Sequence, residues 1–426
     1  MNRLSVISVI FGLAGFLVAL AARTLGGFPN CASDERNWAS IAEQVVKGID
    51  WPISGPLHFW LVQTVSYNTG LTYPQTLSVI GLLSVPILLI LILFAYGKLG
   101  LDGLSVKPMD AVLVLLTSSY FWSPMLESRP QQWGQILVFL GIIYGWLAIN
   151  KLAAWWPYAL LLALTGLTHI LSFAILAAGS LILLAILFML HRVSFWQIGS
   201  LLICIIASLT VFILPNGPYA VMLNDIQNNH LKFSANGSLV LLALSLIPVA
   251  LAVFRPPLSK LAGTLAIFFK RNPFGFGLGG VLLVLGLLVF QAIILPAGSW
   301  DPYHGSVGVF VALQAGNLFF AGLLLYGIVI ACQFARLGPE RDVLEKMLIL
   351  LLTMGLIAVS ALVFSLWMRD TNWFLRVLNY SVLFMAPFAA IGFSRINNPG
   401  IKWGVWITMS AVSLFSVVRP PSFFPC

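Results

Sequence analysis

Charged residues are scarce in this chain: Asp, Glu, Lys and Arg make up only 8% of its 426 residues, whereas hydrophobic residues make up 60%. Soluble domains usually contain about 25% charged residues. Acidic residues are the scarcer sign, with 13 of them against 22 basic ones. This composition excludes an ordinary soluble protein and predicts a polytopic membrane protein.

Cysteines are also few, and only Cys31 and Cys426 fall outside the apolar runs. A disulfide between these two stays open, because the predicted topology puts both on one side of the membrane. The sequence shows no metal-ligand spacing, no internal repeat and no low-complexity linker. We therefore expect one membrane domain over residues 1–426, without a separate soluble domain. No resident metal or cofactor is predicted, while assistance by a divalent cation stays open.

Long apolar runs take up most of the chain. About 20 apolar residues span a hydrocarbon core about 30 Å thick, so we predict an all-α transmembrane bundle of about thirteen spans. Two of these spans are separated only by His169, and counts of twelve or fourteen stay open. The predicted spans are 4–22, 73–97, 109–126, 131–150, 152–168, 170–190, 195–215, 237–254, 276–296, 307–334, 347–367, 377–394 and 403–418.

Basic residues indicate the orientation. Most Lys and Arg fall in alternate loops on one side, which predicts a cytoplasmic N-terminus by the positive-inside rule. Asp110, Arg192 and Arg395 belong to this side. Its excess positive charge suits contact with anionic membrane lipids, and we expect no nucleic-acid partner. All histidines except His191 fall on the other side, so a polar site is expected to open outward.

The first outer loop, residues 24–72, has the pattern most suggestive of chemistry. Its apolar residues over 34–47 recur at helical spacing, which predicts an amphipathic helix on the membrane surface. Asp34 and Glu35 begin this helix, where the helix dipole alone would favour carboxylates. A second short amphipathic stretch, Leu57 to Val65, follows a turn rich in glycine and proline.

This loop resembles the start of the GT-C superfamily of integral membrane glycosyltransferases. It is most similar to the branch that contains protein O-mannosyltransferases and the lipid A aminoarabinose transferase. The matching residues are Asp34, Glu35, Ala39, Ile41, Ala42, Gly48, Asp50, Trp51, Pro56, Leu57, Trp60 and Leu61.

The resemblance implies a GT-C-like fold and an active site on the non-cytoplasmic face of a membrane, which we expect to be a bacterial inner or plasma membrane. It also implies a sugar donor carried by a polyprenyl phosphate, and a lipid, glycan or protein acceptor. Asp34, with Glu35 beside it, is the carboxylate that the resemblance places at the donor sugar.

One departure concerns the donor phosphate. Similar enzymes have Lys-Pro-Pro-Leu where this chain has Ser54-Gly55-Pro56-Leu57, so the lysine expected near the phosphate is missing. Four other outer residues are candidates to replace it, namely His58, Arg129, Arg369 and Arg376.

Other outer residues each have two interpretations, one functional and one structural. Glu127 could supply a second carboxylate, or it could form a loop ion pair with Arg129 worth at most about 1 kcal/mol. Arg369 and Arg376 suit a phosphate group, and they equally suit anchoring at the membrane interface. His169 lies in an apolar stretch, where an ionisable residue is a candidate for function, although a solvated turn would also explain it.

The predicted function is thus transfer of a sugar from a polyprenyl-phosphate donor. The main alternative is a multi-spanning transporter or a flippase for lipid-linked saccharides, a class that usually shows repeats and ionisable residues near helix midpoints. An O-antigen polymerase or ligase is disfavoured, because the late outer loops, 298–306 and 368–376, are short.

Overall fold

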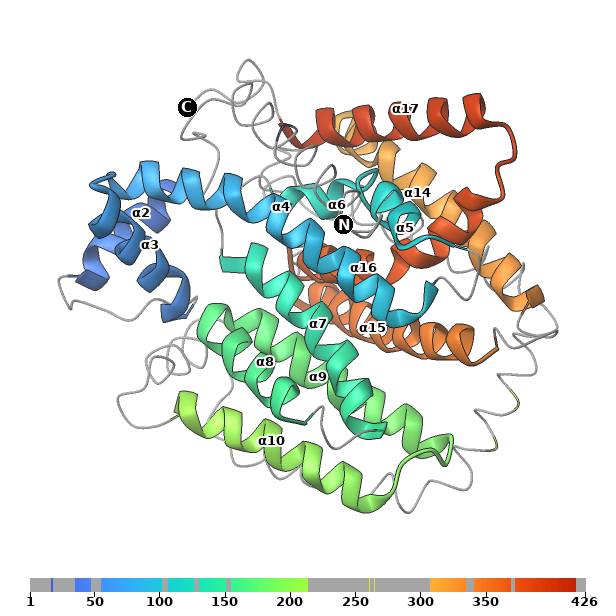
Figure 1. Cartoon of the computed structure of the whole chain (residues 1–426), viewed down its shortest axis with the longest axis horizontal. Helices are drawn as coiled ribbons and strands as arrows, with labels where there is room; N and C mark the ends of the chain where they lie inside the picture. The colour runs from blue at the N-terminus through green and yellow to red at the C-terminus, as the bar shows by residue number, and fades with distance from the viewer. Residues whose placement is uncertain are drawn as a thin grey trace, which may run out of the picture.

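All regular secondary structure in the described part of the chain is helical (Figure 1). The computed structural model describes residues 35–46, 55–101, 106–125, 130–150, 155–213, 307–334, 341–368 and 372–418, with positions 17, 260 and 264. The helices are α2 (Glu35–Val46), α3 (Pro56–Thr69), α4 (Tyr73–Leu99), α5 (Pro108–Leu115), α6 (Ser119–Met125), α7 (Pro130–Asn150), α8 (Trp155–Thr168), α9 (Ile170–Met189), α10 (Phe195–Ile213), α14 (Val307–Phe334), α15 (Arg341–Met368), α16 (Asn372–Ser394) and α17 (Pro399–Val418).

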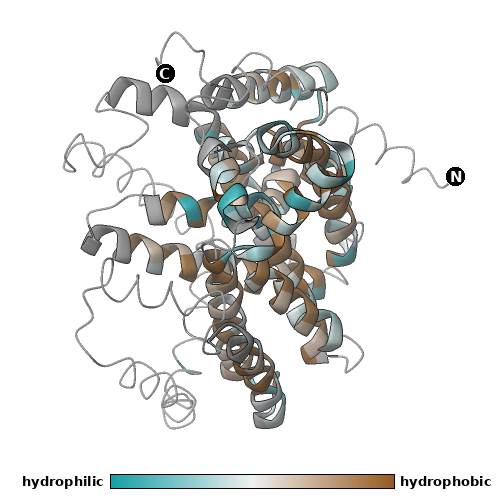
Figure 2. Ribbon diagram, turned by 90° about the vertical axis from the view of Figure 1, so that its left-hand side faces the viewer, coloured by the Kyte–Doolittle hydropathy of each residue, from teal (hydrophilic) through white to brown (hydrophobic). Residues whose placement is uncertain are grey.

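Within these ranges, 5 helices are long and apolar enough to cross a membrane by length and composition. They are α4, α7 and α9, with most of α15 and of α16. Hydrophobic side chains also lie exposed on the bundle, as on one face of α4 at Leu83, Ile87 and Phe94. Figure 2 shows hydrophobic residues along most of the helices. The protein is therefore a helical membrane protein, which confirms the predicted class.

Most of the predicted spans that fall in the described ranges coincide with helices. His169 separates α8 from α9, as the sequence indicated. With 14 residues, α8 is about 21 Å long at the usual rise per residue, and it is not among the candidate spans. The predicted spans 237–254 and 276–296 lie outside the described residues, as does 4–22 apart from Leu17.

The predicted span 109–126 is not continuous, because α5 ends before Leu116 and α6 begins at Ser119. Asn317 of α14 supports this break: its Oδ1 accepts from the Ser119 backbone N–H at 3.1 Å and from the Ser118 hydroxyl at 3.0 Å. Trp122 Nε1 donates to the Leu116 carbonyl at 2.8 Å. Side chains and a neighbouring helix thus satisfy the backbone groups that the break frees, as membrane burial requires.

The helix α16 packs against α14, α15, α5 and α7, and is the centre of the bundle. Its contact with α14 is very close, because a Cβ on Gly327 would collide with the Phe388 carbonyl oxygen. Gly392 allows the same approach from the α16 side, where a Cβ would collide with the Leu323 carbonyl oxygen. Small residues commonly permit such packing in membranes. The Tyr96 hydroxyl ties α4 to α16 through the Leu383 carbonyl, at 2.8 Å.

A second, smaller hydrophobic cluster joins α2 and α3 to the first turns of α4 (Figure 1). Ala42, Phe59 and Leu77 are buried in it, while Ser40 and Glu43 are exposed. This confirms the amphipathic pattern of α2. The apolar face of α2 packs on α3 and α4, and its expected position at the membrane surface stays a prediction.

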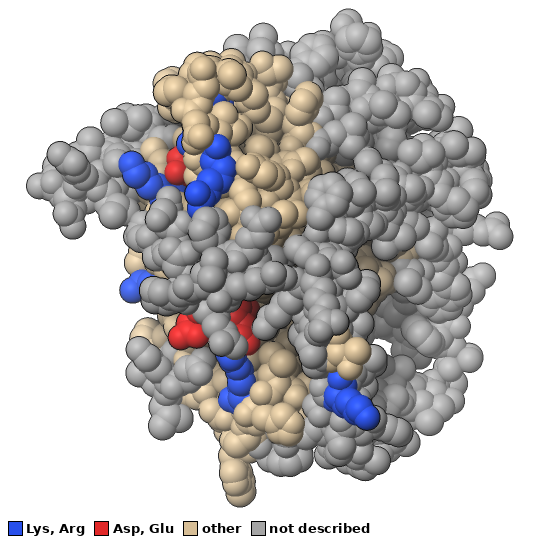
Figure 3. Space-filling view, turned by 90° about the vertical axis from the view of Figure 1, so that its right-hand side faces the viewer, with Lys and Arg blue, Asp and Glu red and all other residues tan. Residues whose placement is uncertain are grey.

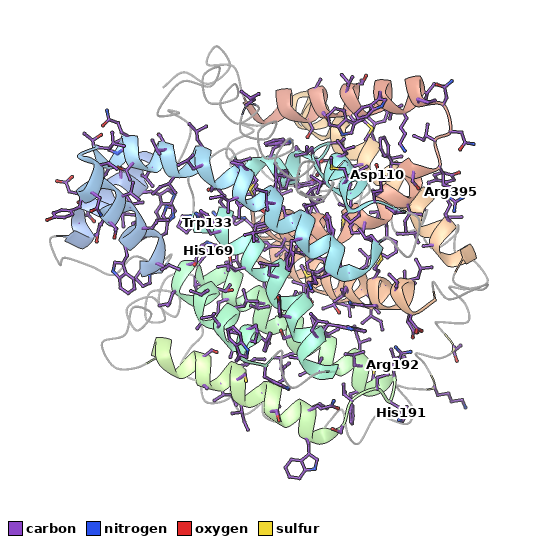
Figure 4. All side chains as sticks on the ribbon, in the orientation of Figure 1. Asp110, Trp133, His169, His191, Arg192 and Arg395 are labelled. Atoms are coloured by element: carbon purple, nitrogen blue, oxygen red, sulfur yellow. The ribbon has the colours of Figure 1, made fainter. Side chains whose placement is uncertain are left out.

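The two ends of the bundle differ in their side chains. Asp110, Arg192 and Arg395 lie at one end, which we term the charged end, and Trp133 and His169 lie at the opposite end, near α3, which we term the α3 end (Figure 4). Figure 3 shows Lys and Arg side chains over the face at the charged end. The predicted separation of Asp110, Arg192 and Arg395 from His169 is confirmed. Which end faces the cytoplasm stays a prediction.

Candidate functional site at the α3 end

Three of the residues singled out from the sequence come together at the α3 end. They are His58 near the start of α3, His169 between α8 and α9, and Arg376 near the start of α16. Tyr380, one turn after Arg376 on α16, has its hydroxyl 3.5 Å from His169 Nδ1, and both Arg376 and His58 lie within electrostatic reach of the His169 ring. The packing of α3 on α8 and of α16 on α7 brings these distant parts of the chain together.

The ring of His169 has a defined protonation pattern. His169 caps the N-terminus of α9, and its Nδ1 accepts from the Ser172 backbone N–H at 3.3 Å. A backbone N–H can only donate, so Nδ1 carries no proton, and the proton of the neutral ring is on Nε2. Burial, and then the charges of Arg376 and His58, lower the His169 pKa from 6.5 to about 3. His169 is therefore a neutral ring whose N–H donor is at Nε2.

Two hydroxyl groups hold this ring in place. The Ser172 hydroxyl lies 2.9 Å from His169 Nδ1, and because Nδ1 is an acceptor, the hydroxyl donates to it. Tyr380 OH lies 2.7 Å from Ser172 Oγ and donates in turn. This chain of donors runs from α16 to the α8–α9 junction. The sequence analysis missed both residues, because serine and tyrosine within apolar helices give no separate signal.

Close packing of α7 on α9 makes this arrangement possible. A Cβ at Gly134 would collide with the Ser172 side chain, and it would lie 3.4 Å from His169 Cβ. Only a glycine therefore lets α7 approach the hydroxyl chain so closely. Gly134 positions the site through backbone proximity alone.

His58 is buried without a hydrogen-bond partner. Its side chain is 2% exposed, and neither ring nitrogen has a partner among the described residues. Burial lowers its pKa from 6.5 to about 4, so the ring is neutral near neutral pH. Phe59 contacts the imidazole edge to face, with 5.6 Å between ring centroids. A buried polar ring of this kind usually has a partner, which makes His58 a candidate for ligand contact.

The first turns of α7 add a group of amides that the sequence analysis did not identify. Gln131, Gln132 and Gln135 are all buried. Gln132 Nε2 donates to the carbonyls of Met125 at 3.0 Å and Gly81 at 3.3 Å. Gln135 Nε2 donates to the Asn379 carbonyl of α16. The available signal was the concentration of amides in Pro130-Gln131-Gln132-Trp133-Gly134-Gln135, which is unusual within a predicted span.

Four other candidates from the sequence lie outside the described residues. These are Asp34, Glu127, Arg129 and Arg369. Glu35 is the first residue of α2, but its side chain is not described. Arg376 is described and exposed. The structure therefore brings His58, His169 and Arg376 together, and it leaves the carboxylates as predictions.

The side chains of this site suit a ligand that carries an anionic group. Arg376 supplies a cation, and His169 supplies an N–H donor, both of which suit phosphate oxygens. Among the residues that the structure describes, no three His, Cys, Asp or Glu side chains lie close enough to hold a metal ion.

The break between α5 and α6 is the other irregular feature within the bundle. Thr117 and Ser118 are fully buried there. The Thr117 hydroxyl donates to the Val114 carbonyl at 2.7 Å, and Asn317 binds the start of α6. These protein contacts complete the hydrogen bonding of the break, whereas the α3 end has buried groups without partners. The α3 end is thus the stronger candidate for ligand binding.

Comparison with known proteins gives no relative for this chain: no protein-family model, curated protein or solved structure matches it.

Proposed function

We propose that this protein is a membrane glycosyltransferase that moves a sugar from a polyprenyl-phosphate donor to an acceptor hydroxyl. One observation carries the proposal: Arg376, His169 and His58 converge at the end of a membrane helix bundle that also carries α2, the helix that follows Asp34 in the sequence. The first-loop resemblance to GT-C glycosyltransferases points to the same end of the molecule. A lipid-linked donor also suits a site at the end of membrane helices.

The proposed reaction gives each group a role. The bond between the anomeric carbon and the phosphate oxygen breaks, and its electron pair leaves with the phosphate. Arg376 and the Nε2–H of His169 stabilise the charge that develops there. The acceptor oxygen bonds to the anomeric carbon, and Asp34, assisted by Glu35, takes its proton. Glu127, Arg129 and Arg369 are further candidates for contact with the donor.

The proposal includes a GT-C-like fold of about thirteen spans, with a cytoplasmic N-terminus and the α3 end on the non-cytoplasmic face. The packing of α2 and α3 over the first turns of α4 supports a role of these two helices at the candidate site, because both belong to the α3 end. The acceptor is a lipid, a glycan or a protein.

A transporter or lipid-linked saccharide flippase is the second candidate. The interrupted helix α5–α6 favours it, because discontinuous helices often form transporter binding sites. The hydrogen bonds from Asn317 and Trp122 that complete this break weigh against it.

The proposal is tested with Asp34→Asn, and with Asp110→Asn at the charged end as the matched control. Both proteins are purified in mild detergent, their bound lipids are identified by mass spectrometry, and release of free polyprenyl phosphate is followed. We expect Asp34→Asn to retain a glycosylated polyprenyl phosphate and to lose turnover by at least about a hundredfold, the usual scale for general-base catalysis. Asp110→Asn should turn over like the wild type.

Two results would contradict the proposal. Full turnover in Asp34→Asn would remove the carboxylate from the mechanism. Absence of any polyprenyl lipid from both proteins, together with no turnover by the wild type, would favour the transporter.

A further inference from the structure

Buried polar atoms without partners are concentrated at the α3 end. Most of the buried side-chain polar atoms without a hydrogen-bond partner among the described residues come from α2, α3, the first turns of α4 and the first turns of α7, and the others lie on α8, α9 and α17. Buried polar groups in folded proteins are almost always hydrogen-bonded, so this concentration requires explanation. The unpartnered atoms at the α3 end are Trp38 Nε1, both ring nitrogens of His58, Thr76 Oγ1, Ser78 Oγ, Gln131 Nε2, Gln132 Oε1, Trp133 Nε1 and Gln135 Oε1.

The orientation of two of these amides follows from their bonds. Gln132 Nε2 donates to two backbone carbonyls, and Gln135 Nε2 donates to the Asn379 carbonyl. A carbonyl can only accept, so these nitrogens cannot be exchanged with the amide oxygens. The oxygens of Gln132 and Gln135 are therefore true acceptors without partners.

The unpartnered set contains both donors and acceptors. Trp133 Nε1 can only donate, whereas the oxygens of Gln132 and Gln135 can only accept. A metal ion would use only the acceptors, and a phosphate would use only the donors. A sugar offers several hydroxyls that each donate and accept, so it can satisfy both kinds of group. The indole of Trp133 also offers an apolar face for a sugar ring.

These amides adjoin the groups assigned to the donor phosphate. Gly134 lies between Trp133 and Gln135 in the sequence, and its Cα faces Ser172 and His169. Figure 4 shows Trp133 and His169 at the same end of the bundle. Both sets of groups therefore lie at the same end of the bundle, as a ligand with one charged part and several hydroxyls would require.

We infer that the first turns of α7 bind the sugar of the donor, with Gln131, Trp133 and Gln135 as the residues that determine sugar affinity. This inference rests on the proposed function, because it assigns one part of the proposed donor. It goes beyond that function by naming a subsite that the GT-C resemblance did not supply.

The test measures the affinity of the purified protein for bare undecaprenyl phosphate and for the same lipid carrying glucose, mannose or arabinose. The variants are Gln131→Met and Gln135→Met, since methionine has nearly the length and volume of glutamine. Gln197→Met is the control, because Gln197 also donates to a backbone carbonyl, that of Ile149 at 2.6 Å, but at the charged end.

We expect the wild type to prefer at least one glycosylated lipid. Each α7 variant should lose about fivefold to tenfold of that preference, which corresponds to one or two hydrogen bonds. The affinity for bare undecaprenyl phosphate should stay unchanged in both, and Gln197→Met should bind like the wild type. A preference that persists in both variants would overturn the inference, as would an equal loss for the bare lipid.

A second probe separates this inference from the proposed function. If the wild type binds neither kind of lipid, the proposed function fails, and octyl glycosides of the same three sugars then test the subsite alone. Thermal stabilisation of the wild type but not of Gln131→Met would preserve a sugar subsite in a protein of another function. Equal stabilisation of both proteins, or of neither, would overturn the subsite as well.

Discussion

The charged end and the α3 end use polar residues in opposite ways. At the charged end, Arg192 and Glu345 form a partly exposed ion pair at 2.9 Å, and Lys402 lies 4.6 Å from the centre of the Phe393 ring. At the α3 end, polar side chains such as His58 and Gln132 are buried and retain atoms without partners. The protein itself completes the first arrangement. Under the proposed function, a polar ligand supplies the missing partners of the second arrangement, so the α3 end is the candidate functional end.

The largest expected effect is on stability and turnover, and it comes from adding one methyl group at Gly134. Gly134→Ala should force α7 away from α9, because the new Cβ collides with Ser172. Overpacking of this kind costs about 1–3 kcal/mol, and the displacement should also abolish turnover by disturbing His169. Gly199→Ala in α10 is the control, since a Cβ there meets nothing within 4 Å. Thermal unfolding and turnover of the two variants measure the difference.

A compensating change sharpens this test. Ser172→Gly combined with Gly134→Ala removes the collision but also removes the hydroxyl that donates to His169. The double variant should regain most of the stability and none of the activity. Recovery of activity would contradict the role given to the hydroxyl chain, and equal stability of Gly134→Ala and Gly199→Ala would contradict the close packing.

A smaller effect on folding stability is expected from a decrease in pH. His58 has a folded-state pKa of about 4, below its ordinary value of 6.5, so the unfolded chain binds more protons between these values. Stability is therefore full above about pH 6.5 and falls as the pH decreases toward 4. Between about pH 7 and about pH 5 the loss from this residue should be about 2 kcal/mol.

The measurement is the apparent melting temperature as a function of pH. His58→Asn should melt with a shallower dependence on pH than the wild type. His191→Asn is the control, because His191 is exposed and has a positive φ of 58°, which asparagine tolerates. An unchanged slope in His58→Asn would show that His58 is accessible to protons in the folded protein.

Local patterns were sufficient for the parts of the fold that depend on nearby residues. The apolar spacing predicted α2, and a single polar residue, His169, predicted the division between α8 and α9. The break between α5 and α6 was not predicted, because it depends on Asn317, which lies 199 residues from Ser118. The apolar run around the break gave only the signal of a continuous span.

The candidate site could be predicted only in part, for the same reason. Ionisable residues in an apolar sequence attract attention, so His58, His169 and Arg376 were identified individually. Their convergence depends on the packing of α3, α9 and α16, which a sequence pattern does not determine. Ser172 and Tyr380 take their roles from contact with His169 across the bundle, and the uncharged glutamines of α7 were treated as part of a span.

The central claim is that a polyprenyl-phosphate lipid binds at the α3 end, and photo-crosslinking tests it most directly. The purified protein is irradiated with an undecaprenyl phosphate analogue that carries a diazirine beside the phosphate, and labelled peptides are identified by mass spectrometry. We predict labels on α3, on the first turns of α7 and on the start of α16, with competition by unlabelled undecaprenyl phosphate. Labels confined to α5, α6 and α14, or to the charged end, would contradict the account.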